Sequence, residues 1–229
     1  MKKIALLMVS IVFIPGILKA QSSFQQLTFG GGVGVAGAYA GAQVQKTTLA
    51  AFAAAGYYPI PDLNFNLEGQ VGALAGAAIP GQKDLKSFNN HYQAIMLDAD
   101  IHLGLFFDYR QSNFLTIIKG FYGGAGYGVV NDNVTNTDLA NPKTTDNVKN
   151  TVRMVPVILG YEYNLLNQYN EPFLKLCLSY SFNYCLDKGI DGYPTTYTNG
   201  ANYYNYISAG IKYTIILRGV SGRTYNKLD

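Results

Sequence analysis

The segment Gln93–Tyr109, QAIMLDADIHLGLFFDY, decides the fold class of this chain. Its odd-numbered positions from 95 to 107 are all apolar, whereas its even-numbered positions include Asp98, Asp100 and His102. A period of two residues places these two sets on opposite faces of a strand, while a helix would scatter them around its axis. The segment is therefore predicted to be a strand with one apolar and one polar face.

The same alternation recurs along the chain, for example in Asn64–Val71, Leu174–Tyr184 and Ile207–Leu217. We predict eight strands, at 26–39, 48–58, 64–78, 92–107, 114–130, 151–164, 173–186 and 201–217. The connections 40–47, 79–91, 131–150 and 187–200 are each longer than those beside them in the chain, which are 59–63, 108–113 and 165–172, although 40–47 is no longer than 165–172. Alternation of short turns with long loops is typical of an outer-membrane barrel. Pro156 falls inside a predicted strand and is expected to mark a bulge or a strand end.

These patterns predict an all-β fold: an eight-stranded, antiparallel, up-and-down transmembrane β-barrel. Strands cross hydrocarbon only in a closed sheet, because every backbone N–H and C=O must be paired there. The interior of an eight-stranded barrel has room only for a filling of side chains, so the large apolar residues are expected to face lipid. Nineteen tyrosines suit the membrane interfaces, where a ring is buried and its hydroxyl is wet. The predicted interfacial girdle is Tyr57, Tyr58, Tyr109, Tyr161, Tyr163 and Tyr203.

The first twenty residues have the pattern of a secretory signal. Lys2 and Lys3 form a positive start, an apolar stretch follows, and Ala20 precedes a polar segment. We predict a signal peptide at 1–20 that is cleaved after Ala20, a barrel at 21–217 and a periplasmic tail at 218–229. The net charge of +3 equals the three lysines of the first twenty residues, so the remainder is formally neutral. A neutral body argues against nucleic-acid binding.

Charged residues on the polar strand faces are predicted to form an ion-pair network in the lumen. Isolated buried charges are costly, so acids and bases in a narrow barrel should pair. The predicted network is Glu68, Asp98, Asp100, His102, Glu162, Lys175 and Lys212. We predict no catalytic residue, no metal site and no cofactor. The pattern G-x-G-x-x-G at Gly32–Gly37 is interpreted as close-packed strand residues, because no acidic residue follows at the spacing of a nucleotide site.

Two cysteines, Cys177 and Cys185, lie on one predicted strand and on the same face. They are eight positions apart, or about 26 Å at ~3.3 Å per residue, which is too far for a disulfide. They are interpreted as small residues that face the lumen.

The export signal, the glycine-rich first strand and segments such as Arg153–Leu165, RMVPVILGYEYNL, resemble small outer-membrane β-barrel proteins of Bacteroidota, including the broad PorT-like group. The resemblance covers the predicted mature chain and rests on pattern rather than on an exact motif. It implies an eight-stranded barrel of the outer membrane without a known enzymatic activity.

We therefore predict a non-enzymatic, porin-like outer-membrane barrel with a filled lumen. Its partners would be the lipid bilayer and a protein or glycan that binds the long loops 131–150 and 187–200. One alternative is a lipid-modifying barrel enzyme that uses His91 or His102 as a base. Another is a soluble periplasmic ligand-binding barrel, whose apolar face would point inward.

Overall fold

The computed structural model describes residues 25–39, 44–77, 86–107, 112–138, 145–169, 171–187, 190 and 203–217. The predicted signal peptide and C-terminal tail lie outside these residues. The elements in chain order are β1 (Gln26–Tyr39), β2 (Val44–Lys46), β3 (Thr48–Ile60), β4 (Leu63–Ala77), β5 (Lys86–His102), η1 (Leu103–Leu105), α2 (Asn113–Ile118), β6 (Phe121–Asp138), β7 (Thr145–Leu166), β8 (Pro172–Cys185) and β9 (Tyr203–Ile216).

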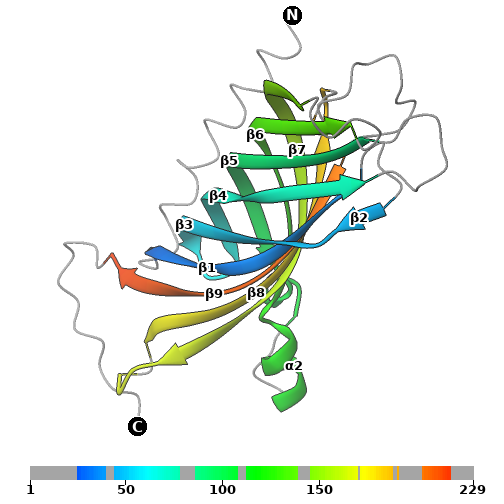
Figure 1. Ribbon diagram of the computed structural model, residues 1–229. Coiled ribbons are helices and arrows are strands. Elements are labelled where there is room, and N and C mark those ends of the chain that lie inside the picture. Colours follow the sequence, from blue (N-terminus) through cyan, green and yellow to red (C-terminus); the bar gives the residue numbers. More distant parts are fainter. Residues whose placement is uncertain are drawn as a thin grey trace, which may run out of the picture.

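Eight long strands close into an antiparallel barrel (Figure 1). Each long strand pairs with the next one in the chain, and β1 pairs with β9 from Gln26↔Ile216 to Tyr39↔Tyr203, which closes the ring. The short strand β2 precedes β3 in the chain and pairs with the last residues of β4, from Val44↔Ala77 to Lys46↔Ala75. The predicted eight-stranded, antiparallel, up-and-down barrel is confirmed. In the described part of the chain, no helix has the length and hydropathy that a membrane crossing requires.

We call the barrel end that holds Gln26 and Ile216 the terminal end, and the other the distal end. The terminal-end connections are 61–62, 103–120 and 167–171, and the distal-end connections are 40–43, 78–85, 139–144 and 186–202. The sequence predicts short turns at one barrel end and long loops at the other. This prediction is wrong, because the long connection 103–120, which contains η1 and α2, lies at the terminal end with the short turns. Figure 1 shows α2, in green, outside the barrel wall.

Strand β5 is shifted from its predicted range of 92–107, since it begins at Lys86 and ends at His102. The apolar alternation continues through residue 107, but a strand also needs a neighbour with which to pair. Leu63 at the start of β4 pairs with Ile101, and the backbone N–H of His102 donates to the carbonyl oxygen of Asp62 in the β3–β4 turn at 2.9 Å. β4 offers no partner beyond that turn, so the chain leaves the sheet through η1.

The predicted strand 114–130 is wrong in its first part, where Asn113–Ile118 forms α2. The side chain of Ser112 accepts a hydrogen bond from the backbone N–H of Phe114 at 3.3 Å and so caps this helix. Strand β6 begins only at Phe121 and continues to Asp138, with its even-numbered residues facing the barrel interior.

The predicted loop 131–150 is also wrong, because β6 continues to Asp138 and β7 begins at Thr145. The composition of this segment is typical of a loop, but its side chains bond across the two strands. The hydroxyl of Thr135 donates to Asn147 Oδ1 at 3.0 Å, and the hydroxyl of Thr151 donates to Asn131 Oδ1 at 2.9 Å. Such cross-strand pairs stabilise an antiparallel sheet.

Pro156 lies within β7, and the expected bulge or strand end is wrong at this position. Ala125 pairs with Val157 and Gly128 pairs with Met154, so the register between β6 and β7 is the same on both sides of the proline. Only the intervening pairs are missing. Because proline has no backbone N–H, the ladder loses hydrogen bonds there without a shift of register.

The two faces of the barrel wall differ in chemistry. Asp98 faces the interior and is 2% exposed, whereas its neighbour Leu97 faces outward and is 60% exposed. Large apolar side chains face outward on every long strand: Phe29, Leu49, Leu67, Ile95, Tyr127, Leu159, Leu178 and Ile211. A soluble ligand-binding barrel would have the opposite facing, so the structure argues against that alternative.

Candidate functional site: the filled barrel interior

Glu162 of β7 is the centre of a charged group inside the barrel, towards the terminal end. Its carboxylate accepts hydrogen bonds from Lys212 Nζ at 2.9 Å and from Lys175 Nζ at 3.1 Å. The three side chains are between 2% and 6% exposed. Buried charges are tolerated when they are paired and hydrogen-bonded, as they are here. One carboxylate thus bridges two ammonium groups that come from β8 and β9.

Tyr58 completes this group, and its position corrects the predicted interfacial role. Its hydroxyl donates to Glu162 Oε2 at 2.7 Å, and Lys175 Nζ lies 3.6 Å from the centroid of its ring. A cation above an aromatic face is attracted by the quadrupole of the ring. Along β3 the even-numbered residues face inward, so only Tyr57 of this adjacent pair faces outward. That period was the sequence signal that could have placed Tyr58 in the interior.

His102 lies beside the charged group but is not hydrogen-bonded to it. Its Nε2 atom is 3.8 Å from Glu162 Oε2, and its ring centroid is 5.1 Å from that of Tyr122. The Tyr122 ring lies across Gly160, where an added Cβ would be 2.3 Å from the ring carbon Cζ. Gly160 therefore leaves the space that the aromatic ring occupies.

The remaining predicted network acids, Glu68, Asp98 and Asp100, line the same interior but contact amides instead of lysines. Asn64, Asn66 and Gln70 of β4 donate to Asp100, Asp98 and Glu68 at 3.1, 3.5 and 2.9 Å, respectively. Within the described residues, no salt bridge joins these three acids to a lysine, because Glu162 engages both interior ammonium groups.

A cavity of about 20 Å³ lies between the charged group and the acids, with Asn66, Asp98, Asp100 and Lys212 in its lining. Asp98 Oδ2 and Asp100 Oδ1 are buried without a hydrogen-bond partner in the described part of the chain. A polar space of this size can hold one water molecule, which would supply such partners. Residues 25–217, apart from the stretches outside the description, contain no group of three His, Cys, Asp or Glu side chains placed to hold a metal ion.

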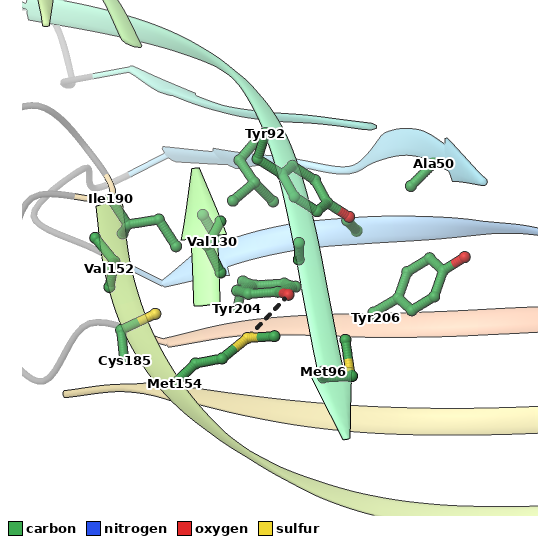
Figure 2. Close-up of a cluster of buried hydrophobic side chains, with 14 of the residues drawn as sticks. Ala50, Tyr92, Met96, Val130, Val152, Met154, Cys185, Ile190, Tyr204 and Tyr206 are labelled. Carbon is green, nitrogen blue, oxygen red and sulfur yellow. Dashed lines mark hydrogen bonds between the residues drawn. The ribbon is translucent and has the colours of Figure 1, made fainter. Parts of the chain in front are cut away.

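Apolar and aromatic side chains fill the distal part of the interior (Figure 2). The rings of Tyr92 and Tyr204 have their centroids 5.4 Å apart. The hydroxyl of Tyr204 lies 3.4 Å from Met154 Sδ, the contact dashed in Figure 2. Val130 and Ile190 are fully buried in the same cluster. The interior is therefore filled by charged and polar groups towards one end and by an apolar layer towards the other.

Four of the predicted girdle tyrosines face outward near strand ends: Tyr57, Tyr161, Tyr163 and Tyr203. The Tyr161 ring packs on Phe121 with a centroid distance of 4.8 Å at the terminal end. The Tyr203 ring stacks on Tyr39 at 4.9 Å at the distal end. Tyr109 lies outside the described residues.

The two histidines lie on opposite faces of β5. His91, expected in a connection, lies on β5 and faces outward, whereas His102 is buried. No hydrogen bond links either histidine to a serine, threonine or cysteine among the residues that the structure describes. Cys177 and Cys185 are both unpaired thiols that face the interior. Cys177 Sγ lies 3.8 Å from Glu162 Oε1, so it belongs to the charged group.

The G-x-G-x-x-G match at Gly32–Gly37 lies entirely within β1, and the next described element is a strand. A Cβ added to Gly32 would be 2.7 Å from the Phe52 ring, so this position gives space to an interior side chain. A nucleotide-binding turn would instead connect a strand to a helix.

An ion pair at the distal end was not predicted from the sequence. Arg153 donates from Nε and Nη2 to the two carboxylate oxygens of Asp187, at 2.8 and 2.7 Å. These hydrogen bonds, and a third from the Arg153 backbone N–H, hold the pKa of Asp187 below its ordinary value. The pair joins β7 to the segment that follows β8, and no local pattern links two residues so far apart in the chain.

At the terminal end, burial raises the pKa of Asp62 in the β3–β4 turn above its ordinary value, although Lys119 acts in the opposite direction. Asp62 Oδ1 occupies the space that a Cβ at Gly104 would need. Gly104, in the first part of the connection 103–120, is therefore packed against this turn.

No protein-family model matches the chain, and no curated protein matches it. Among solved structures, Neisserial surface protein A is similar, with 18% identity over 84% of this chain and 97% of its own and a TM-score of 0.45. Ail, the attachment invasion locus protein of Yersinia pestis, has 10% identity over 83% and 98%, with a TM-score of 0.46. The N-terminal β-barrel domain of Pseudomonas aeruginosa OprF has 14% identity over 83% and 97%, with a TM-score of 0.37.

Proposed function

We propose that this chain is a non-enzymatic, integral β-barrel of the outer membrane with a structural or surface-interaction role at its distal end. The observation that carries the proposal is the outward apolar belt, which includes Leu97 at 60%, Leu159 at 61% and Ile211 at 54% exposure. Soluble monomers rarely expose contiguous apolar patches of more than a few hundred Å². Acyl chains would cover this belt, and the outward tyrosine rings near both barrel ends suit the two interfaces.

The filled interior supports a structural role over transport. Tyr58, Tyr92 and Tyr204 are fully buried across the lumen, and the charged group around Glu162 blocks its terminal half. In a planar bilayer the reconstituted barrel should show no stable large conductance. A large, stable conductance would contradict a closed lumen.

The surface role is assigned to the distal end, where β7 extends from Thr145 to Arg153 beyond its last pair with β8. A protein or glycan partner would bind there, together with the segment 187–200, of which only residues 187 and 190 are described. Membership of the Bacteroidota PorT-like group is part of the proposal and rests on the pattern of the sequence.

Cell fractionation tests the location. The mature chain should be in the outer-membrane fraction, begin at Gln21 by N-terminal sequencing, and run faster on a gel before boiling than after it. Recovery in the soluble periplasm, with no change of mobility on boiling, would refute the proposal. Retention of residues 1–20 would refute the cleavage site alone.

A further inference from the structure

On the outward face of β5 and β6, apolar chemistry changes to polar chemistry within one step along the strands, and β7 is polar on both sides of that step. One cross-strand row of outward residues is Gly69, Ile95, Val129 and Arg153. The next row towards the distal end is Val71, Gln93, Asn131 and Thr151, and the one after it is Ala73, His91, Asn133 and Lys149. β4 stays apolar throughout, whereas β5 and β6 become polar at the same level and β7 is polar from Arg153 onwards.

A hollow of about 860 Å³ lies on the outer wall over this change, with Leu49 and Ala73 at one side and Asn133 and Lys149 at the other. A second hollow of about 570 Å³ lies over Ala51, Ala53, Gly69 and Ile95. The two share Val71, Gln93 and Asn131, so they form one groove that is polar at its distal end and apolar below. The groove exists because Ala51, Ala53 and Gly69 in its floor are small, whereas Val71 and Ile95 beside them are larger and exposed.

The polar part of the groove is suited to an anion. The hydroxyl of Thr151 donates to Asn131 Oδ1 at 2.9 Å, which leaves the amide N–H groups of Asn131 available as donors. Lys149 is exposed, and no salt bridge joins it to a carboxylate among the described residues. Asp132 also lines the hollow, but its side chain faces the interior and is 3% exposed.

We propose that this groove binds one anionic lipid of the surrounding bilayer, with its phosphate at Lys149 and Asn131 and one acyl chain over Ala51, Ala53 and Gly69. The inference rests on the proposed function, since it requires the barrel to span a membrane. The groove crosses the boundary at which the outward wall changes from apolar to polar. A lipid matches both halves of such a groove, because its chain fits the apolar half and its charged headgroup fits the polar half.

Native mass spectrometry of the mature barrel, released from micelles with equal amounts of phosphatidylglycerol and phosphatidylcholine of identical chains, tests this. We expect one phosphatidylglycerol to remain bound per barrel. Lys149→Gln should lower its affinity by about tenfold, because one charge-assisted hydrogen bond is lost, while Lys149→Arg should retain it. Ala53→Leu should abolish binding of both lipids by filling the floor. Ala209→Leu, a matched change on the outward face of β9, should have no effect.

Equal retention of the two lipids by the wild-type barrel would overturn the inference, and so would unchanged binding in the Lys149→Gln and Ala53→Leu variants. Displacement of the lipid by free glycerol phosphate at comparable concentration would also overturn it, because the acyl groove would then contribute nothing. Heat-dependent mobility of each variant shows that it is folded. A wild-type barrel that never enters bilayers contradicts the proposed function, whereas one that enters them without retaining phosphatidylglycerol contradicts only this inference.

Discussion

The substitution Glu162→Gln removes the one negative charge that two buried lysines share, while it keeps the shape of the side chain and a hydrogen-bond acceptor for Tyr58. Lys175 and Lys212 are held at 3.1 and 2.9 Å from the carboxylate, and their side chains are only 4% and 6% exposed. Breaking a buried ion pair by removing one partner costs about 3–5 kcal/mol. Because two ammonium groups lose their partner here, we expect the upper part of that range, a large share of a typical unfolding free energy of about 5–15 kcal/mol.

The measurement is urea unfolding of the mature chain in detergent, followed by far-UV circular dichroism and by gel mobility, since the chain has no tryptophan. Asp146→Asn, on the exposed part of β7, is the matched control and should change stability by less than about 0.5 kcal/mol. The triple variant Glu162→Gln, Lys175→Met, Lys212→Met should recover most of the loss, because apolar replacement of a complete buried ion group is often neutral. A Glu162→Gln variant within about 1 kcal/mol of the wild type would refute the reasoning that the charges are buried and mutually dependent.

Three further predictions concern packing, titration and thiol access. Gly160→Ala should destabilise the barrel by about 1–3 kcal/mol because its Cβ would meet the rigid Tyr122 ring at 2.3 Å, whereas Gly37→Ala, with no atom within 4 Å, should have almost no effect on the unfolding midpoint. The pKa of Asp187 is lowered in the folded state, so its ion pair with Arg153 is fully present above the unfolded value of about 3.9 and is lost only as the pH falls through the lower folded value. Carboxyl NMR should follow this titration, and Arg153→Gln should return the pKa towards its ordinary value; an unchanged titration would contradict the ion pair. The two buried cysteines should resist a maleimide reagent in the folded barrel and react after unfolding, and rapid labelling of the native protein would show that the interior is open.

The sequence by itself determined the fold class and the facing of most residues. Strict alternation in Gln93–His102 requires a strand, and the size of its apolar residues requires that face to point out of a narrow barrel. The same parity places Glu162, Lys175 and Lys212 inside, where the structure brings them into contact. The parity of β3 also places Tyr58 inside, but the composition argument for an interfacial girdle conflicts with that parity, because tyrosine suits both a membrane interface and a polar interior.

Only the tertiary structure decided where strands end and which charges meet. β5 ends at His102 because its neighbour β4 begins after the turn at Asp62. Segment 131–138 is a strand because 145–151 pairs with it. In both cases the sequence of the segment does not specify its pairing partner. Alternation fixes which face a residue is on, but not which interior group it reaches. Glu162, and not Asp98 or Asp100, is the partner of both lysines because of the register of adjacent strands: Glu162 of β7 pairs with Cys177, two residues from Lys175 on β8, and Lys175 pairs with Lys212 on β9. A local period cannot encode this register.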